Sequence, residues 1–159
     1  MPTHDGESVT YRIATVNDLD AVGALRWAME TERHPEQAGD HAAYIAVVNA
    51  SIRDEFARGS QIAFLAESGG DVIACALLIW WAMIPTLLES HRARGYVSTV
   101  YTIPDYRRRG IARQLMTNLM THARELGVSR LILRASEMGR PLYLDLGFAP
   151  SDSLEWNEG

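Results

Sequence analysis

Three arginines and a glycine, residues 107–110, stand directly before the most regular helical pattern of the chain. From Arg109 onward, apolar residues recur at helical intervals until Gly127, and glycine favours the position just after a helix end. The preceding segment 96–103 is rich in β-branched and aromatic residues and stops at a proline, which is typical of a strand. The sequence therefore predicts a strand, a tight turn and a helix over about 109–126.

The start of this helix is predicted to bind an anion. The first backbone N–H groups of a helix have no helical partners, and the positive end of the helix dipole lies there. Gly110 lacks the β-carbon that would block the approach of a phosphate. Four arginines add formal positive charge at the same end: Arg107, Arg108, Arg109 and Arg113. Because basic residues at a helix N-terminus are otherwise unfavourable by about 0.3–1 kcal/mol each, a compensating anion is expected, either a ligand or a local carboxylate such as Asp105.

The remaining segments show strand and helix patterns. Strands are predicted at 9–14, 61–67, 72–81, 129–135 and 154–156, and helices at 18–32, 41–58 and 140–146. Residues 82–95 fit neither period and are predicted to form a loop with a helical turn after Pro85. The order β-α-α-β-β-β-α-β-α-β indicates a mixed α/β sheet with helices on both faces. At 159 residues with 47% hydrophobic content, one domain over residues 1–159 is expected.

Charge and composition limit the kinds of partner. The formal charge is −5, whereas nucleic acid or an anionic membrane would need a basic face, so neither is expected as a partner. No apolar run approaches the roughly 20 residues that span a bilayer, and the first residues lack a secretion-signal pattern, so a cytoplasmic protein is expected. Cys75, the only cysteine, is expected to be a buried, inert thiol. No spacing of histidines predicts a metal site.

The arginine-glycine turn resembles a cofactor motif of a known family. The segment VYTIPDYRRRGIARQLM is similar to the acyl-CoA pyrophosphate motif of the GNAT N-acetyltransferase superfamily, Arg/Gln-x-x-Gly-x-Gly/Ala, matched by Arg107, Gly110 and Ala112. Residues 14–25 resemble the first helix of that family, and residues 133–148 resemble its second cofactor motif. The resemblance covers nearly the whole chain. It implies the GNAT fold, in which two central parallel strands splay apart.

By this resemblance, acetyl-CoA would lie along the splayed strand and across the turn. Pantetheine would bond to the open backbone of Val100, Tyr101 and Thr102. The backbone N–H groups that would cradle the pyrophosphate belong to Arg107, Arg108, Arg109, Gly110, Ile111 and Ala112, with Arg113 adding charge. Ser136 stands where many relatives have a polar residue near the cofactor, although a strand-capping role is an equal alternative. No metal is implied.

The implied reaction moves an acetyl group from acetyl-CoA to a primary amine, on a small molecule or a peptide. Attack on a thioester needs a neutral amine in line with the carbonyl, so positioning and oxyanion stabilisation can supply most of the rate. The N–H groups of Val100 or Tyr101 are candidate oxyanion donors, and Tyr143 matches the family tyrosine that donates to the CoA sulfur. Thiol and phenol pKa values of about 8.5 and 10 make full proton transfer from Tyr143 uphill by about 2 kcal/mol. Tyr143 is therefore predicted to act as a hydrogen-bond donor.

Several questions stay open at this level. No carboxylate lies in the segment 96–103, and the candidate bases are Glu67, Glu89, His91 and Tyr96. Trp80, Trp81 and Tyr44 could line an acceptor pocket or pack in the core. Two alternative functions are a CoA-binding module that has lost catalysis, which the missing carboxylate favours, and, more weakly, nucleic-acid binding through the arginines. Many relatives pair, so a homodimer is expected.

Overall fold

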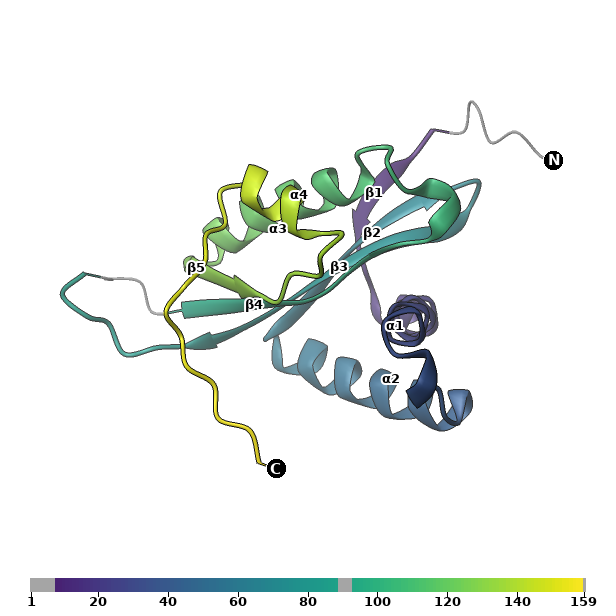
Figure 1. Cartoon of the computed structure of the whole chain (residues 1–159), viewed down its shortest axis with the longest axis horizontal. Helices are drawn as coiled ribbons and strands as arrows, with labels where there is room; N and C mark the ends of the chain where they lie inside the picture. The colour runs from purple at the N-terminus through teal and green to yellow at the C-terminus, as the bar shows by residue number, and fades with distance from the viewer. Residues whose placement is uncertain (1–7, 89–92, 159) are drawn as a thin grey trace.

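The described part of the computed structural model, residues 8–88 and 93–158, contains a five-stranded sheet between two layers of helices (Figure 1). The strands are β1 (Thr10–Ile13), β2 (Gln61–Ser68), β3 (Asp71–Ala82), β4 (Ala93–Thr102) and β5 (Val128–Leu133). The helices are α1 (Leu19–Arg33), α2 (His41–Arg58), α3 (Ile111–Glu125) and α4 (Arg140–Asp145). The strands lie in chain order, and neighbours run antiparallel except β4 and β5, which are parallel. This is the mixed α/β fold that the sequence predicts.

Alternation along the central strands gives the sheet two buried faces. Phe64 and Ala76 face α3, whereas Leu65 and Cys75 face α1 and α2. The helices thus cover both sides of the sheet, as predicted (Figure 1). Cys75 is buried, as predicted, and its full burial raises the pKa of the thiol to about 12, which favours the neutral form.

Two predicted elements are wrong within the described residues. Residues 154–156 form no strand; they are extended but outside the sheet, and the Leu154 and Trp156 side chains are 99% and 84% exposed. A strand needs a hydrogen-bonding neighbour, which three alternating residues cannot specify. Residues 82–88 contain no helical turn, and β4 begins at Ala93 because its first three residues pair with the end of β3. The part of the predicted loop at 89–92 lies outside the described residues.

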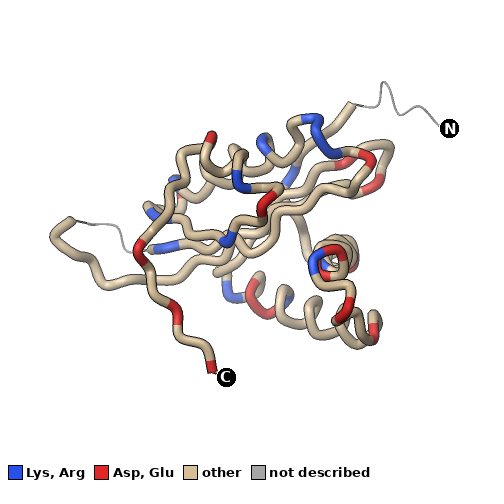
Figure 2. Tube along the Cα trace, viewed as in Figure 1, with Lys and Arg blue, Asp and Glu red and all other residues tan. Residues whose placement is uncertain are grey.

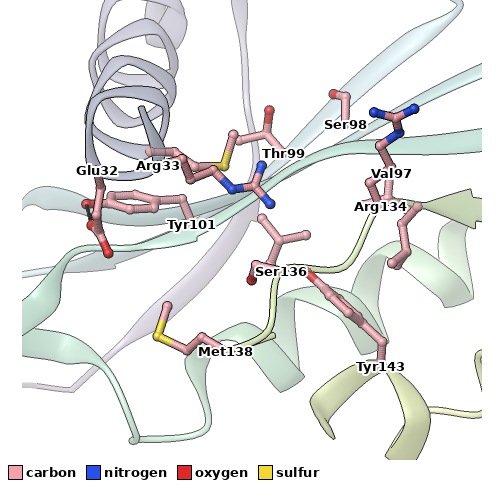
Figure 3. Close-up of a pocket in the computed structure, with 13 residues that line it drawn as sticks. Glu32, Arg33, Val97, Ser98, Thr99, Tyr101, Arg134, Ser136, Met138 and Tyr143 are labelled. Atoms are coloured by element: carbon pink, nitrogen blue, oxygen red, sulfur yellow. Dashed lines mark hydrogen bonds between the residues drawn. The ribbon is translucent and has the colours of Figure 1, made fainter. Parts of the chain in front are cut away.

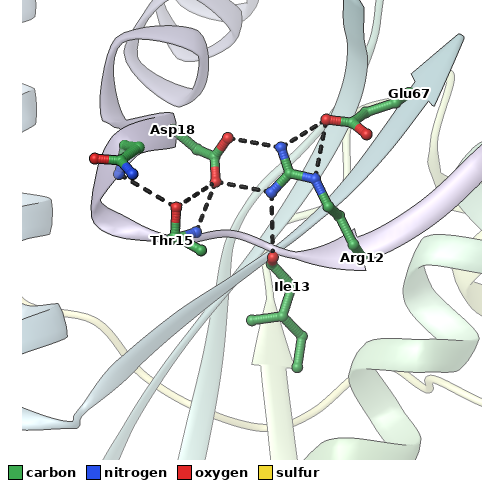
Figure 4. A network of polar contacts seen from close by, with 6 residues as sticks. Arg12, Ile13, Thr15, Asp18 and Glu67 are labelled. Atoms are coloured by element: carbon green, nitrogen blue, oxygen red, sulfur yellow. Dashed lines mark hydrogen bonds and ion pairs between the residues drawn. The ribbon is translucent and has the colours of Figure 1, made fainter. Parts of the chain in front are cut away.

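An ionic network ties β1 to the entry of α1 (Figure 4). The Arg12 guanidinium donates to the Asp18 carboxylate at 2.7 and 2.8 Å and to Glu67 at 2.6 and 2.9 Å. Asp18 also accepts from the backbone N–H of Thr15 at 2.7 Å, in a capping box that precedes α1. The hydrogen bond from Arg12 holds the pKa of Asp18 far below its ordinary value, against the opposing effect of burial.

This network predicts a specific loss of stability in acid. A group whose folded pKa is depressed stabilises the fold above its ordinary pKa, here 3.8, and this contribution is lost as the pH falls below that value. Because Arg12 is partly exposed, we expect Asp18→Asn to lower the free energy of unfolding by about 1–2 kcal/mol at neutral pH, or Tm by roughly 3–6 °C. The difference from wild type should shrink near pH 3, measured by thermal denaturation. Asp54→Asn on α2 is the control, and a pH-independent difference would contradict this role for Asp18.

Candidate functional site

The parallel strands β4 and β5 separate part-way along their length. Their pairing ends at Val97 and Leu133. The next residue, Ser98, has no partner on β3, because the register between β3 and β4 shifts there. Beyond this bulge β4 continues to Thr102, and β3 is its only strand neighbour there within the described residues. Its other edge is open, which is the splay expected from the fold.

A pocket occupies the open side of β4 (Figure 3). It lies between the end of α1, the free edge of β4 and the segment that runs from β5 into α4. Its lining comprises Met29, Glu32, Arg33, Val97, Ser98, Thr99, Val100, Tyr101, Leu133, Arg134, Ser136, Met138 and Tyr143. The structure therefore brings together four predicted site residues, Val100, Tyr101, Ser136 and Tyr143. Thr102 is buried at the end of β4 and lies outside this lining.

The turn between β4 and α3 presents open backbone amides. Arg108 and Gly110 both have positive φ, at 64° and 78°, and Gly110 is the residue that precedes the first turn of α3. Alternating left-handed residues of this kind direct successive N–H groups to one side, as in anion-binding nests. Apart from its chain neighbours, no atom in the described part of the chain would lie within 4 Å of a β-carbon at Gly110, and the first turn of α3 contains no acidic residue. Among the described residues, no side-chain oxygen accepts from the amides of residues 108–113.

Three of the four arginines at this turn have protein partners. Arg107 binds Glu32 of α1 through two hydrogen bonds of 2.6 and 2.8 Å. Arg109 donates to the carbonyl of Asp105 at 3.0 Å and lies 5.0 Å from the centre of the Tyr106 ring. Arg113 pairs with Asp145 at 2.9 Å, while Arg108 is exposed and has no hydrogen bond or ion pair within the described part of the chain. Figure 2 shows the blue arginine segment in the turn that enters α3.

Glu32 joins α1 to β4 and to the turn. Its carboxylate accepts from Arg107 and, at 3.0 Å, from the hydroxyl of Tyr101. The Nε of Arg107 donates to the carbonyl of Thr102 at 2.9 Å. The hydrogen bond from Arg107 lowers the pKa of Glu32, although burial opposes this effect. The pKa of Tyr101 is raised, mainly because the phenol is buried and secondly because its hydroxyl binds Glu32. Glu32 is therefore held as a carboxylate whose oxygens are already used.

Tyr143 enters the pocket from α4. Its ring packs edge-on against Phe148, with the ring centres 6.0 Å apart. Burial raises the pKa of Tyr143, while the nearby charge of Arg33 acts in the opposite direction. The phenol therefore remains protonated at neutral pH. Its hydroxyl can donate into the pocket.

Ser136 shapes the turn that leads to α4. Its Oγ accepts from the backbone N–H of Gly139 at 3.1 Å, and its carbonyl accepts from the N–H of Arg140 at 2.9 Å. Ser136 also lines the pocket. Its hydrogen bonds thus form the turn before α4 and do not cap β5, while the predicted contact of Ser136 with a cofactor stays a prediction.

Arg26 of α1 holds the bulge of β4. Its Nη1 donates to the Oγ1 of Thr99 at 2.6 Å and to the carbonyl of Ser98 at 3.3 Å. Thr99 is 1% exposed, so this bond satisfies a buried hydroxyl. Arg26 therefore fixes β4 at the point where the strands separate.

The candidate bases have different environments. Glu67 is bound by Arg12 on β1 and lies outside the pocket lining, and Tyr96 pairs with Ile132 of β5. Glu89 and His91 lie outside the described residues. Of the candidate acceptor aromatics, Trp80 packs against the buried cluster beneath α3, Trp81 is 41% exposed, and Tyr44 contacts the ring of Trp27 with centres 5.1 Å apart. Within the described ranges, no three His, Cys, Asp or Glu side chains gather so that they could hold a metal ion.

Comparison with known proteins decides the family. Residues 20–148 match the model of the Acetyltransferase (GNAT) family. The chain belongs to this family. The chain is also similar to a glucosamine 6-phosphate N-acetyltransferase of Trypanosoma brucei brucei, 31% identical over 85 residues. These residues are 54% of this chain and 56% of that relative, so the match spans just over half the length of each.

Solved structures share the GNAT fold over almost the full chain. A predicted acetyltransferase of Clostridium acetobutylicum, crystallised with acetyl-CoA, has a TM-score of 0.81 and 26% identity, covering 94% of this chain and 96% of its own. A GCN5-related N-acetyltransferase of Ralstonia eutropha has a TM-score of 0.76 and 28% identity, covering 95% and 99%. No helix in the described part of this chain has the length and apolar character needed to cross a membrane.

Sequence reasoning missed the charged residues of the lining, Glu32 and Arg33 on α1 and Arg134 after β5, and also Arg26, which holds β4 from α1. Helical spacing was a usable signal. The buried stripe of α1 includes Leu25 and Met29, and continuing it by one turn reaches Glu32 and Arg33. Glu32 and Arg33 therefore lie on the same face of α1 as its buried residues, one turn further along, beside the open edge of β4.

Proposed function

We propose that this GNAT protein transfers the acetyl group of acetyl-CoA to a primary amine by direct nucleophilic attack. The observation that carries the proposal is the set of unobstructed amides at residues 108–113, placed next to the splayed edge of β4. These groups fit the cofactor: the amides suit a pyrophosphate, and the open backbone of Val100 and Tyr101 suits pantetheine. The similar Clostridium acetobutylicum protein that was crystallised with acetyl-CoA supports the same cosubstrate.

In the proposed reaction the amine nitrogen attacks the thioester carbonyl carbon. A carbon–nitrogen bond forms, the carbon–sulfur bond breaks, and sulfur leaves with its electron pair as a thiolate. The N–H of Val100 or Tyr101 would donate to the developing oxyanion, and the Tyr143 hydroxyl would donate to the sulfur. The amine loses its proton to solvent or to a base, and Glu32, the carboxylate in the pocket lining, is held by Arg107 and Tyr101.

That occupied carboxylate favours one alternative, a CoA-binding module without catalysis. The alternative of nucleic-acid binding is weakened, because three of the four arginines at the turn bind protein groups. The acceptor proposed first is an amino sugar phosphate, after the relative that acts on glucosamine 6-phosphate, followed by peptides with a free N-terminus or a lysine.

Two measurements test the proposed function. CoA should raise Tm, whereas NAD and duplex DNA should not. Release of free thiol from acetyl-CoA is then followed across a panel of glucosamine 6-phosphate, an N-terminal peptide and a lysine peptide. Acceptor-dependent thiol release supports the enzyme. Stabilisation by CoA with a silent panel favours the module, and absence of any CoA effect contradicts both.

A further inference from the structure

Arg33 is a cation that points into the pocket and has no partner among the described residues. It lies in the last turn of α1, and Figure 3 shows its guanidinium extending from α1 over the open edge of β4 toward Ser136. Arg33 makes no hydrogen bond or ion pair within the described part of the chain. The arginines at the entry of α3 differ in this respect, because most of them bind protein oxygens.

The other charged groups of the lining do not neutralise Arg33. Glu32 is adjacent in sequence, but its two oxygens accept from Arg107 and Tyr101. Arg134, at the other end of the pocket, pairs with Glu155 of the C-terminal segment. The titratable groups that face this space are therefore Glu32, Arg33, Tyr101, Arg134 and Tyr143, and Arg33 is the uncompensated charge among them.

Tyr143 stands on the wall opposite Arg33 (Figure 3). Burial raises the pKa of its phenol, and the charge of Arg33 is close enough to pull that pKa in the opposite direction. Arg33 from α1 and the Tyr143 hydroxyl from α4 thus face the same volume of the pocket. In the proposed function, this volume holds the sulfur end of the thioester arm.

We propose that Arg33 is a further catalytic residue, which stabilises the CoA thiolate as it leaves. This inference rests on the proposed function, in which acetyl-CoA lies along β4. When the carbon–sulfur bond breaks, the electron pair stays on sulfur, so a negative charge appears in a pocket whose other described arginine, Arg134, is paired with Glu155. A nearby arginine lowers the pKa of a thiol, and it stabilises such a charge more strongly in a pocket than in water.

Thiol titration in the protein–CoA complex tests this role directly. The pKa of the thiol of bound CoA is measured from the ultraviolet absorbance of the thiolate as the pH is varied. This measurement needs no acceptor. We expect Arg33→Gln to raise this pKa by about 1, a tenfold change in thiolate formation, while Arg33→Lys retains most of the wild-type value. Arg53→Gln, an exposed arginine on α2, is the matched control and should leave the pKa unchanged.

Kinetics separate this role from acceptor binding. With any active acceptor, Arg33→Gln should lower kcat about tenfold and leave KM for the acceptor within about twofold. The proposal would be overturned if KM rose only for acceptors that carry phosphate or carboxylate, while kcat and the thiol pKa stayed unchanged. That result would mean that Arg33 binds the anionic group of the acceptor. An unchanged thiol pKa in a variant that binds CoA normally overturns the inference alone. Failure of the wild-type protein to bind CoA overturns the proposed function as well.

Discussion

Replacing Gly110 with valine is expected to weaken CoA binding at least about 100-fold, or about 2.7 kcal/mol, while the chain still folds. The β-carbon at this position would enter open space, since no atom of the described residues beyond its chain neighbours lies within 4 Å of it. In the proposed complex that space holds the pyrophosphate, so the added side chain displaces the ligand and not the protein. The measurement is isothermal titration with CoA, together with the CoA-induced rise in Tm.

Backbone strain must be separated from blocked binding. Gly110 has φ of 78°, and a β-branched residue there costs about 1–3 kcal/mol of stability whatever the ligand does. Gly127, at the other end of α3, offers a matched control because its φ is 74° and its β-carbon would also meet no atom within 4 Å. The free energy of unfolding should fall by a similar amount in both valine variants, yet only Gly110→Val should bind CoA more weakly. If the two variants bind CoA with equal affinity, the pyrophosphate of CoA does not lie at Gly110.

Local patterns in the sequence predicted the elements that hold this site. The α3 stripe that includes Ile111, Leu115 and Leu119 is buried as its spacing requires, and Gly127 ends the helix. Strand β4 was recognisable from its β-branched and aromatic residues, although its start was missed. These features depend on neighbours within a few positions, so a single sequence contains them. The three-residue strand at 154–156 failed because its pairing partner would have to be distant.

Contacts between residues far apart in the sequence could not be predicted for the same reason. Arg107 meets Glu32 across 75 positions of sequence, and Arg26 meets Thr99 across 73. Helical spacing could place Arg26 and Glu32 on the face of α1 that continues its buried stripe, but it could not choose their partners. The sequence could therefore not decide between a ligand and a local carboxylate as the partner of Arg107, whereas the structure pairs its guanidinium with Glu32. The backbone amides of the turn remain the groups that are open to a phosphate.

The second large effect is expected at Tyr143. Replacement by phenylalanine should lower kcat by about 100-fold, the lower end of the usual range for removing one hydrogen-bond donor to a developing charge, and change KM for acetyl-CoA by less than about threefold. Removing the hydroxyl leaves the ring in place against Phe148, so packing is preserved. Tyr11→Phe on β1 is the control, because burial likewise raises the pKa of that phenol, yet Tyr11 lies outside the pocket lining.

The pH dependence distinguishes donation from structural support. Because burial raises the pKa of Tyr143, its phenol stays protonated through neutral and mildly alkaline pH, and kcat should show no loss there that is attributable to this group. A hydrogen-bond donor to sulfur matters most when the leaving group is basic. The penalty of Tyr143→Phe should therefore shrink when acetyl-CoA is replaced by an acetyl thioester of a more acidic thiol. An equal loss of kcat with both thioesters would mean that Tyr143 supports the pocket wall and does not assist the departure of the thiolate.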